Sequence, residues 1–392
     1  MSIKTIGVVG LGYVGLPFLV KFAEAGFKVK GYDIDESKVM QLKAGFSYIG
    51  DVDSEALKRL NPNYVEFSSD PSILRDCELI AICVPTPVNA NKSPNYEPMI
   101  SAANTVAQFA AEGAIVVLES TVGPGFTKVC KEGWLRKYRV IFSPERVDPS
   151  NKDFSIEGIP KVVGCEDDET YSEFEEVYGQ VFKLHRVSST TTAELVKLLE
   201  NTFRAMNLAF IHEFEKICEN FSVNTREVID AASTKPFGFM PFYPGVGVGG
   251  HCIPVDPHYL LASYDSTLIR IGMRINEAQP IRSFEKVRPY LSDDKPALVM
   301  GVTYKPNVAD IRESPSIELM NIMLTYSDVA YYDPFIPSLE LSNGKVIESL
   351  TLEQVLSSEF SAIVVTVNHS SVDYKAICKG AENVIDFCGA LS

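Results

Sequence analysis

Residues 5–15 read TIGVVGLGYVG, a short β-branched run that leads directly into the motif GxGxxG. An apolar pattern with helical spacing, VGLPFLVKFAEAG, follows without a break. In such a motif Gly10 permits a tight turn, Gly12 lets a ligand approach the backbone, and Gly15 lets the helix pack on the strand. This strand–turn–helix order predicts the opening unit of a doubly wound α/β sheet.

The same alternation continues along the chain and divides it. Further strand candidates read FKVKGYD, ELIAICVP, AIVVLEST and RVIFSPE, and the pattern stops after about residue 186. Strand–helix alternation restarts at KPALVMGVTY and continues through SPSIELMNIMLTY, VAYYDP, SAIVVTV and NVIDF. We therefore expect an α/β protein with two Rossmann-like doubly wound domains, at 1–187 and 289–392, joined by a central helical domain at 188–288.

The central domain is expected to contain one long helix at 192–221. Its apolar residues recur at helical spacing and predict one apolar face. The members of this expected face are Leu195, Leu198, Leu199, Thr202, Met206, Phe210, Phe214 and Ile217.

An acidic residue accompanies the glycine motif and indicates which cofactor it would hold. Asp33 ends the next strand candidate, GYD. Its separation in sequence from the glycine motif is about that at which an acidic residue contacts the ribose of a dinucleotide. Its carboxylate would accept from the ribose hydroxyls and repel a 2′-phosphate, which favours NAD over NADP. Two alternatives stay open, FAD and a glycine-rich turn with no ligand.

A second strand–loop–helix unit, GVTYKP followed by DIRESP, weakly echoes the first. Lys305 and Arg312 lie at a strand end, where open α/β sheets bind ligands. They are interpreted either as phosphate-binding cations or as part of a solvated charged loop. Ser314 is expected to cap the helix that Pro315 starts.

A thiol lies in an unusual loop, GVGVGGHCIPVDP, at 245–257. Cys252 is interpreted either as a small structural residue or as a nucleophile. The glycines before it offer backbone N–H groups that could face an oxyanion or phosphate. Asp256 is near enough in sequence to share the site.

Other polar residues lie where this architecture places its sites. Thr121 and Glu145 follow strand candidates, and Lys197 and Asn201 lie four residues apart on the long helix. Lys197 is either a lysine whose aliphatic part packs among leucines while its ammonium group reaches solvent, or a catalytic amine shielded from solvent. Together with NAD, these groups indicate oxidation through a covalent intermediate, because a thiohemiacetal gives up a hydride more easily than an aldehyde.

Composition excludes several other classes of protein. The net charge of −15 argues against nucleic acid and anionic membrane as general partners. The eight cysteines form no CxxC pair and no His/Cys cluster with metal-ligand spacing, so we expect no metal site. Because the N-terminus enters a strand-like run at once and no apolar stretch reaches roughly 20 residues, we expect a reduced, cytoplasmic protein.

Seven stretches, in order along nearly the whole chain, resemble the UDP-glucose/GDP-mannose dehydrogenase family, the NAD-dependent four-electron oxidases of nucleotide sugars. They are GLGYVGLP, VPTP, ESTVGPG, SPERVDP, ELVKLLENTFRAMN, GGHCIPVDPHYL and GVTYKPNVADIRESPS. The resemblance implies that Cys252 carries a thiohemiacetal and then a thioester. It implies Glu145 as the general base for thioester hydrolysis and Thr121 as a residue that positions water and cofactor.

The resemblance also implies the remaining site residues. The proton-handling network would be Lys197, Asn201 and Asp256. The residues expected to contact NAD are Gly10, Gly12, Tyr13, Val14, Gly15, Asp33, Lys38, Pro85, Thr86, Thr121 and Arg312. The residues expected to contact the UDP-sugar are Glu145, Arg146, Val147, Lys197, Asn201, Tyr243, Gly245, Gly249 and Lys305. The long helix would form the core of a homodimer, and further assembly stays open.

Two departures from the family pattern bear on the sugar. Val255 stands where members acting on UDP-glucose usually have a lysine, and TKPFGFMPFYPG lacks the arginine those members carry. These features resemble the branch that oxidises UDP-N-acetylhexosamines, and we expect UDP-N-acetyl-D-glucosamine as substrate, in the synthesis of surface polysaccharide such as capsule or lipopolysaccharide. The alternatives are UDP-glucose, UDP-ManNAc or UDP-GalNAc.

Two other classes of protein agree less well with these residues. A sensor that binds NAD or nucleotide sugar without catalysis needs no nucleophile. A two-electron alcohol dehydrogenase would leave Cys252 and Glu145 without a role.

Overall fold

The computed structural model describes residues 3–50, 52–146 and 158–392. The chain forms two compact units, one of residues 1–200 with 258–264 and the other of residues 201–257 with 265–392. No helix in the described ranges is long and apolar enough to cross a lipid bilayer.

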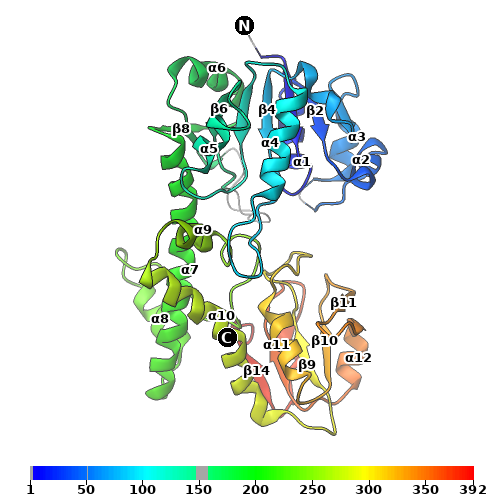
Figure 1. The fold of residues 1–392 in the computed structure, drawn as a ribbon. Helices are drawn as coiled ribbons and strands as arrows, with labels where there is room; N and C mark the ends of the chain where they lie inside the picture. Colours follow the sequence, from blue (N-terminus) through cyan, green and yellow to red (C-terminus); the bar gives the residue numbers. More distant parts are fainter. Residues whose placement is uncertain (1–2, 51, 147–157) are drawn as a thin grey trace. The chain divides into compact units, whose positions relative to one another are not determined.

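The first unit is built on an eight-stranded sheet with the strand order β3-β2-β1-β4-β5-β6-β7-β8 (Figure 1). All neighbouring strands pair in parallel except β6 and β7, which are antiparallel. The strands are β1 (Thr5–Val9), β2 (Lys28–Tyr32), β3 (Val65–Ser68), β4 (Leu79–Ile82), β5 (Ile115–Leu118), β6 (Arg139–Phe142), β7 (Lys161–Gly164) and β8 (Leu184–Val187). The order 3-2-1-4-5-6 is that of dinucleotide-binding sheets, whose ligands bind beyond the carboxyl ends of β1 and β4.

Helices cover both faces of this sheet because its strands are apolar on both sides. Val8 faces a core shared with α1 (Gly15–Glu24) and α6 (Asp168–Tyr178). Val9 faces a second core shared with α4 (Glu97–Phe109) and α5 (Phe126–Glu132). The remaining helices of this part are α2 (Glu36–Lys43), α3 (Ser54–Arg59) and the 3-10 helix η1 (Pro71–Asp76).

The long helix α7 spans Thr190–Asn220 and begins two residues before the predicted start. The apolar residues expected on one face of this helix differ in their burial. Leu198 is fully buried, whereas Leu199 and Phe210 are 66% and 64% exposed. Helical spacing alone does not separate residues packed on the chain's own core from exposed apolar residues.

Three helices follow α7. They are α8 (Thr225–Ser233), α9 (Asp256–Ser263) and α10 (Thr267–Val287), and the 3-10 helix η3 (Arg288–Tyr290) ends α10. Asn224 caps α8 by accepting the N–H groups of Arg226 and Glu227.

The second unit contains a four-stranded parallel sheet with the order β10-β9-β13-β14. Its strands are β9 (Ala297–Met300), β10 (Val329–Tyr332), β13 (Ile363–Val365) and β14 (Val384–Asp386). One face packs on α10 and α11 (Pro315–Met323), and the other packs on α12 (Leu352–Ser357) and α13 (Tyr374–Ile377). The hairpin of β11 (Ser338–Glu340) and β12 (Val346–Glu348) completes the unit.

Candidate active site

The glycine motif after β1 has the geometry that a bound pyrophosphate requires. Gly10 has φ of +89°, and a Cβ there would lie 2.8 Å from the carbonyl oxygen of Cys83. A Cβ at Gly15 would lie 1.8 Å from the carbonyl oxygen of Gly10, so both positions are closed to side chains. Gly12, by contrast, has nothing within 4 Å of its Cβ position. The first and third glycines therefore serve the fold, and the second leaves the backbone open to a ligand.

Asp33 is joined to this loop by hydrogen bonds. Its Oδ2 accepts the N–H of Leu11 at 2.7 Å, and its Oδ1 accepts the N–H of Asp35 at 3.0 Å. The side chain is thereby held at the carboxyl end of β2, beside the glycine turn. Tyr48, which sequence analysis missed, also holds the loop, since its hydroxyl donates to the carbonyl of Leu11. No motif marks Tyr48, because 37 residues separate it from its partner.

Three other residues expected to contact NAD lie in this turn or in the segments that follow β2 and β4. Lys38 lies in α2, and its ammonium group is 5.9 Å from the centre of the Tyr48 ring. Tyr13 is 44% exposed. Pro85 is exposed on the loop that follows β4, the neighbour of β1.

Thr86 follows Pro85 and is held by α9. The hydroxyl of Tyr259, a fully buried residue of α9, donates to the carbonyl of Thr86 at 2.8 Å. The Tyr259 ring meets Tyr96 edge-on at 5.7 Å, and the Tyr96 hydroxyl accepts the N–H of Gly123 at 3.0 Å. These contacts fix the VPTP and STVGPG segments against one another. Tyr259 is a further residue that sequence analysis missed.

Thr121 and Glu145 follow β5 and β6, as expected from their place at strand ends. Thr121 is partly exposed. The Oε1 of Glu145 accepts the N–H of Arg146 at 2.7 Å. Arg146 in turn donates from Nε to both carboxylate oxygens of Glu200, at 3.1 and 3.2 Å. Val147, also expected to contact substrate, lies outside the described residues.

Cys252 is the exposed thiol of the chain. Of the eight cysteines, all within the described ranges, five are buried, two are partly exposed and only Cys252 is exposed. Its carbonyl accepts the N–H groups of Val255 at 3.1 Å and Asp256 at 2.8 Å, a turn that leads directly into α9. The structural interpretation of this cysteine, a small core residue, is therefore wrong.

Asp256 and Asn201 lie together, as the network implied by the resemblance requires. The side-chain nitrogen of Asn201 donates to Oδ2 of Asp256 at 2.5 Å, and Asp256 is only 3% exposed. Lys197 precedes Asn201 by one turn of α7 and is 9% exposed. A lysine so deeply buried does not act as a solvated, snorkelling stem.

Two of the glycines before Cys252, Gly249 and Gly250, pack closely on another segment, and the expected substrate contact of Gly249 stays a prediction. A Cβ at Gly249 would lie 2.6 Å from the carbonyl oxygen of Glu313 and 2.8 Å from Tyr304. The N–H of Gly250 donates to the carbonyl of Arg312 at 3.1 Å, so this donor does not face an oxyanion or phosphate. Packing of the loop on residues 304–315 therefore explains these glycines.

Gly245 and Tyr243 are the other expected substrate contacts in this loop. Gly245 has open space around its Cβ position, and its carbonyl accepts from Gln279 at 3.0 Å. The hydroxyl of Tyr243 donates to Asp230 at 2.7 Å. Neither observation tests substrate contact, which stays a prediction for both residues.

The two cations of the second nucleotide unit have local partners. The hydroxyl of Thr303 donates to the carbonyl of Lys305 at 2.9 Å. Arg312 pairs with Asp310 through Nε, 3.0 Å from each carboxylate oxygen. Lys305 and Arg312 lie in the second unit, so the expected contact of Arg312 with NAD stays a prediction.

Ser314 occupies the N-cap position of α11 but does not cap it as expected. The Ser314 side chain accepts no hydrogen bond from the helix. Its hydroxyl donates instead to the carbonyl of Val302 at 2.7 Å, where it joins the start of α11 to the end of β9.

The expected residues thus fall into two sets. The first unit holds the glycine motif, Asp33, Thr86, Thr121, Glu145 and Lys197. The second unit holds Asn201, Cys252, Asp256, Lys305 and Arg312. Within the sets, the structure brings Asn201 to Asp256 and Asp33 to the glycine turn.

Comparison with known proteins identifies the same three parts of the chain. Residues 4–182 match the NAD binding domain of the UDP-glucose/GDP-mannose dehydrogenase family, residues 191–278 match its central domain, and residues 298–392 match its UDP binding domain. NAD is therefore the cofactor that the first unit binds, and the open backbone at Gly12 fits it.

Individual relatives cover nearly the whole chain. A UDP-N-acetyl-D-glucosamine 6-dehydrogenase of Salmonella typhi is 32% identical over 93% of this chain and 89% of its own. A UDP-N-acetyl-D-mannosamine dehydrogenase of Pyrococcus horikoshii is 32% identical over 97% of this chain and 94% of its own. A solved structure of the UDP-D-ManNAc dehydrogenase from Pyrococcus horikoshii superposes with a TM-score of 0.87 at 30% identity, covering 99% of this chain and 96% of that one. The chain belongs to the UDP-glucose/GDP-mannose dehydrogenase family.

Proposed function

We propose that this chain oxidises C6 of UDP-N-acetyl-D-glucosamine from the alcohol to the carboxylate, with two NAD reduced for each sugar. The observation that carries the proposal is the exposure of Cys252 alone among the eight cysteines, in a turn whose next helix begins with Asp256 held by Asn201. A two-electron dehydrogenase or a sensor has no use for such a thiol. An exposed thiol followed by a fixed carboxylate instead supports covalent catalysis.

The first oxidation needs a group that takes the proton of the C6 hydroxyl. Lys197 and Asp256 are buried, and Asn201 holds the carboxylate in place. In our proposal this network receives the hydroxyl proton and then stabilises the oxygen atom as charge develops on it. Bound NAD would supply the hydride acceptor for both oxidations.

The second oxidation passes through Cys252. A bond forms between Sγ and the aldehyde carbon, and the thiol proton moves to the aldehyde oxygen to give a thiohemiacetal. Loss of that hydroxyl proton and of a hydride gives the thioester. Hydrolysis then forms a bond between water oxygen and the acyl carbon and breaks the C–S bond, with Glu145 taking the water proton and Cys252 leaving as thiolate.

Support for an N-acetylhexosamine comes from Val255. This side chain is 6% exposed and apolar, so it places no cation beside Asp256. The Salmonella typhi relative is named for UDP-N-acetyl-D-glucosamine, which supports our first choice of sugar. UDP-N-acetyl-D-mannosamine is the second candidate, favoured by the name and the structural likeness of the Pyrococcus horikoshii protein. The two sugars differ only in the configuration at C2.

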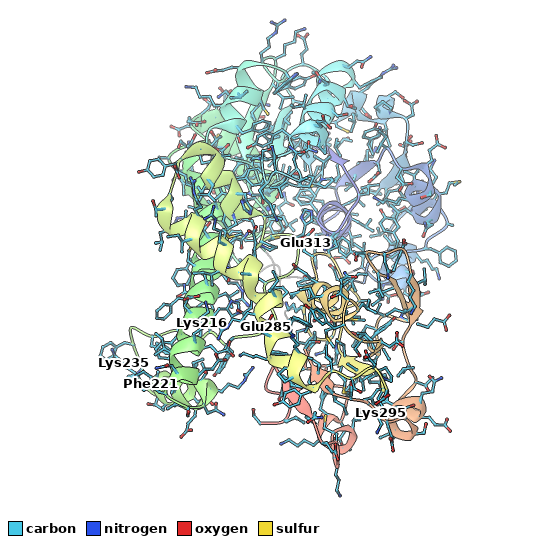
Figure 2. The ribbon with its side chains drawn as sticks, turned by 60° about the horizontal axis from the view of Figure 1, so that its bottom comes forward. Lys216, Phe221, Lys235, Glu285, Lys295 and Glu313 are labelled. Atoms are coloured by element: carbon cyan, nitrogen blue, oxygen red, sulfur yellow. The ribbon has the colours of Figure 1, made fainter. Side chains whose placement is uncertain are left out.

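The exposed side of α7 supports a second copy of the chain as partner. Five large apolar side chains of this helix are at least 43% exposed, and Phe221, one residue beyond it, is 71% exposed (Figure 2). They are Leu195, Leu199, Phe203, Phe210 and Ile217. Exposed apolar rows of this kind are typical of interfaces. We propose that α7 pairs with α7 of a second copy.

The proposal is tested by steady-state NADH formation with four substrates, UDP-GlcNAc, UDP-ManNAc, UDP-GalNAc and UDP-glucose. We expect the highest kcat/KM for UDP-GlcNAc, and Cys252→Ser should lower uronate formation by at least about a thousandfold. Cys378→Ser, at a partly exposed cysteine of the second unit, is the matched control and should keep full activity. A Cys252→Ser enzyme with undiminished uronate formation would contradict the mechanism, and a preference for UDP-glucose would contradict the choice of sugar.

A further inference from the structure

A buried polar cluster lies behind Glu145, where β5, β6 and β7 meet α6. Its centre is Lys161, whose side chain is 4% exposed and whose ammonium group is hydrogen-bonded to the fully buried carboxylate of Glu119. The hydroxyl of Tyr178 donates to the other oxygen of Glu119 at 3.1 Å. A buried ion pair often stabilises a fold no more than apolar residues of similar size would, so the cluster calls for a reason beyond stability.

Lys161 also holds the segment that carries Glu145. Its ammonium group donates to the carbonyls of Ser143 and Pro144, each at 3.3 Å, and these are the two residues before Glu145. The same ammonium group lies 3.7 Å from Oε2 of Glu145. One buried cation therefore fixes both the backbone that leads to Glu145 and the electrostatic surroundings of its carboxylate.

We propose that Lys161 is a positioning residue for Glu145, and that it keeps this carboxylate ionised and in place to take the proton of water during thioester hydrolysis. The inference rests on the proposed function, because it assigns a role within the hydrolytic step. Lys161 itself transfers no proton in that step. The water oxygen bonds to the acyl carbon, the C–S bond breaks, and the water proton moves to Glu145.

The other charges around the cluster agree with this role. Burial raises the pKa of Glu119 to about 7, although Lys161 opposes that rise. Burial alone would lower the pKa of Lys161, but Glu119 and Glu145 outweigh burial and hold it above its usual value.

Two further titratable groups of the cluster, both among the described residues, are neutral at neutral pH. Burial raises the pKa of the Cys83 thiol, which follows β4, and of the Tyr178 hydroxyl on α6, so both groups stay neutral. Arg146, the next residue after Glu145, is paired with Glu200 of α7. Lys161 is thus a cation that faces Glu145 from within the sheet.

Lys161→Met tests the proposal through the two halves of the reaction. In a stopped-flow assay with the best nucleotide sugar, we expect a burst of two NADH per active site followed by a steady rate at least about tenfold below wild type. Intact-mass spectrometry of acid-quenched enzyme should show the acyl adduct on Cys252. The acid limb of the steady-state pH profile should move up by about 1 pH unit or more, because removing a nearby cation favours the protonated form of Glu145.

Two further variants separate this role from a purely structural one. Lys137→Met, which removes an exposed lysine paired with Glu112 in the same unit, is the matched control and should behave like wild type. Glu119→Leu combined with Lys161→Met replaces the buried pair by apolar groups, a change that proteins often tolerate. We expect this double variant to fold and still to accumulate the acyl adduct.

Wild-type hydrolysis with an unmoved acid limb, in Lys161→Met or in the folded double variant, would overturn the proposal. A wild-type enzyme that makes no NADH from any nucleotide sugar would instead contradict the proposed function itself, before any variant is compared.

Discussion

The turns that follow β1 and β9, the first strands of the two nucleotide-binding sheets, have the same backbone geometry. Gly10 and Gly301 have φ of +89° and +91°, and their N–H groups donate to Tyr32 and Tyr332 at 2.8 and 2.9 Å. Each turn is then held by the aspartate that follows the tyrosine. Oδ2 of Asp33 and Oδ2 of Asp333 each accept the next N–H of the turn at 2.7 Å.

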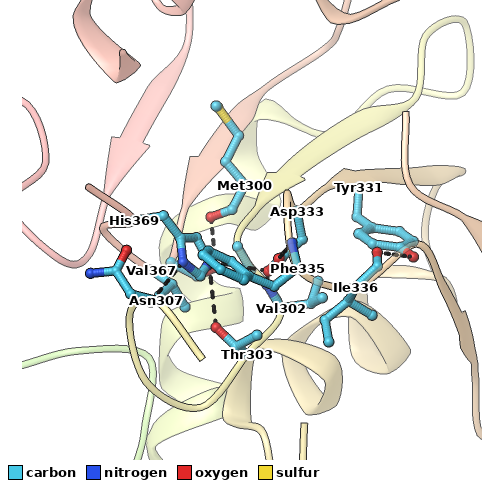
Figure 3. A network of polar contacts seen from close by, with 12 residues as sticks. Met300, Val302, Thr303, Asn307, Tyr331, Asp333, Phe335, Ile336, Val367 and His369 are labelled. Carbon is cyan, nitrogen blue, oxygen red and sulfur yellow. Dashed lines mark hydrogen bonds and ion pairs between the residues drawn. The ribbon is translucent and has the colours of Figure 1, made fainter. Parts of the chain in front are cut away.

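The surroundings of the two aspartates differ. In the second unit the side chain of Asp333 is fully enclosed, and His369, equally enclosed, lies 3.2 Å away (Figure 3). The N–H of Asn307 donates to Nδ1 of His369 at 3.0 Å, which leaves Nε2 to donate to Asp333. His369 thus binds the aspartate of the second unit, whereas in the first unit we expect a ribose to bind the aspartate.

This difference teaches that one turn can serve two purposes. In the first unit it exposes Gly12 and holds Asp33 for a cofactor. In the second unit the His369–Asp333 pair fixes the loop of Thr303 and Asn307, between which lies Lys305, the residue expected to contact the UDP-sugar. The echo between the two sequences therefore reflects a shared turn and does not indicate a second NAD site.

Replacing Asp33 or Asp333 by asparagine should give the largest difference between the two units. Asp333→Asn leaves His369 without its carboxylate in a buried place, and we expect the free energy of unfolding of the second unit to fall by about 3 kcal/mol or more. Denaturant unfolding measures this loss, and the KM for NAD should stay unchanged. Equal stability of Asp333→Asn and wild type would show that the pair does not hold the loop.

The pH dependence of unfolding sharpens this prediction. Burial would raise the pKa of Asp333, but hydrogen bonds from His369, Val302 and Phe335 outweigh it and hold the pKa below its usual value. A carboxyl with a lowered pKa stabilises the fold above its unfolded pKa of about 3.9, and this contribution is lost as the pH falls through the folded value. Asp333→Asn should therefore remove part of the acid dependence below about pH 4.

A pair of glycine substitutions separates fold from ligand binding within the first turn. Gly15→Ala forces a Cβ to within 1.8 Å of a carbonyl oxygen, and we expect a loss of about 2–3 kcal/mol in unfolding free energy. Gly12→Ala, with nothing within 4 Å, should unfold within about 0.5 kcal/mol of wild type but bind NAD at least about tenfold more weakly. Calorimetric titration with NAD measures the binding. A Gly12→Ala protein with wild-type affinity would contradict the placement of the pyrophosphate.

The smallest expected effect is that of Asp33→Asn. Because the ribose would lose a charged acceptor, the KM for NAD should rise about tenfold, and discrimination against NADP should weaken. Steady-state kinetics with both cofactors checks this outcome. If Asp33→Asn left both KM values unchanged, the two aspartates would not differ in function.

Sequence analysis could predict features that depend on residues near one another in the chain. The glycine motif, its strand and helix, and Asp33 follow from local spacing, and the structure has all of them. The pairing of Asp333 with His369 joins residues 36 positions apart, and no spacing rule identifies it.

The dependence on distant contacts also explains which features of α7 and of the Cys252 loop could not be predicted from the sequence. The exposure of Leu199 beside the buried Leu198 depends on what packs against α7. Likewise, Gly249 and Gly250 are set by distant contacts with residues 304–315, whereas the sequence alone favoured a ligand as the reason for them. Contacts between residues distant in the sequence determine these features, and such contacts cannot be read from the periodicity of the sequence.

The number of NADH formed per UDP-GlcNAc consumed tests the central claim most directly, because two NADH per sugar require that the aldehyde is oxidised further to the carboxylate. A limiting amount of UDP-GlcNAc is converted with excess NAD while NADH absorbance and the sugar product are followed. The account predicts two NADH and one UDP-uronate for each sugar. One NADH per sugar, with a released aldehyde, would contradict it.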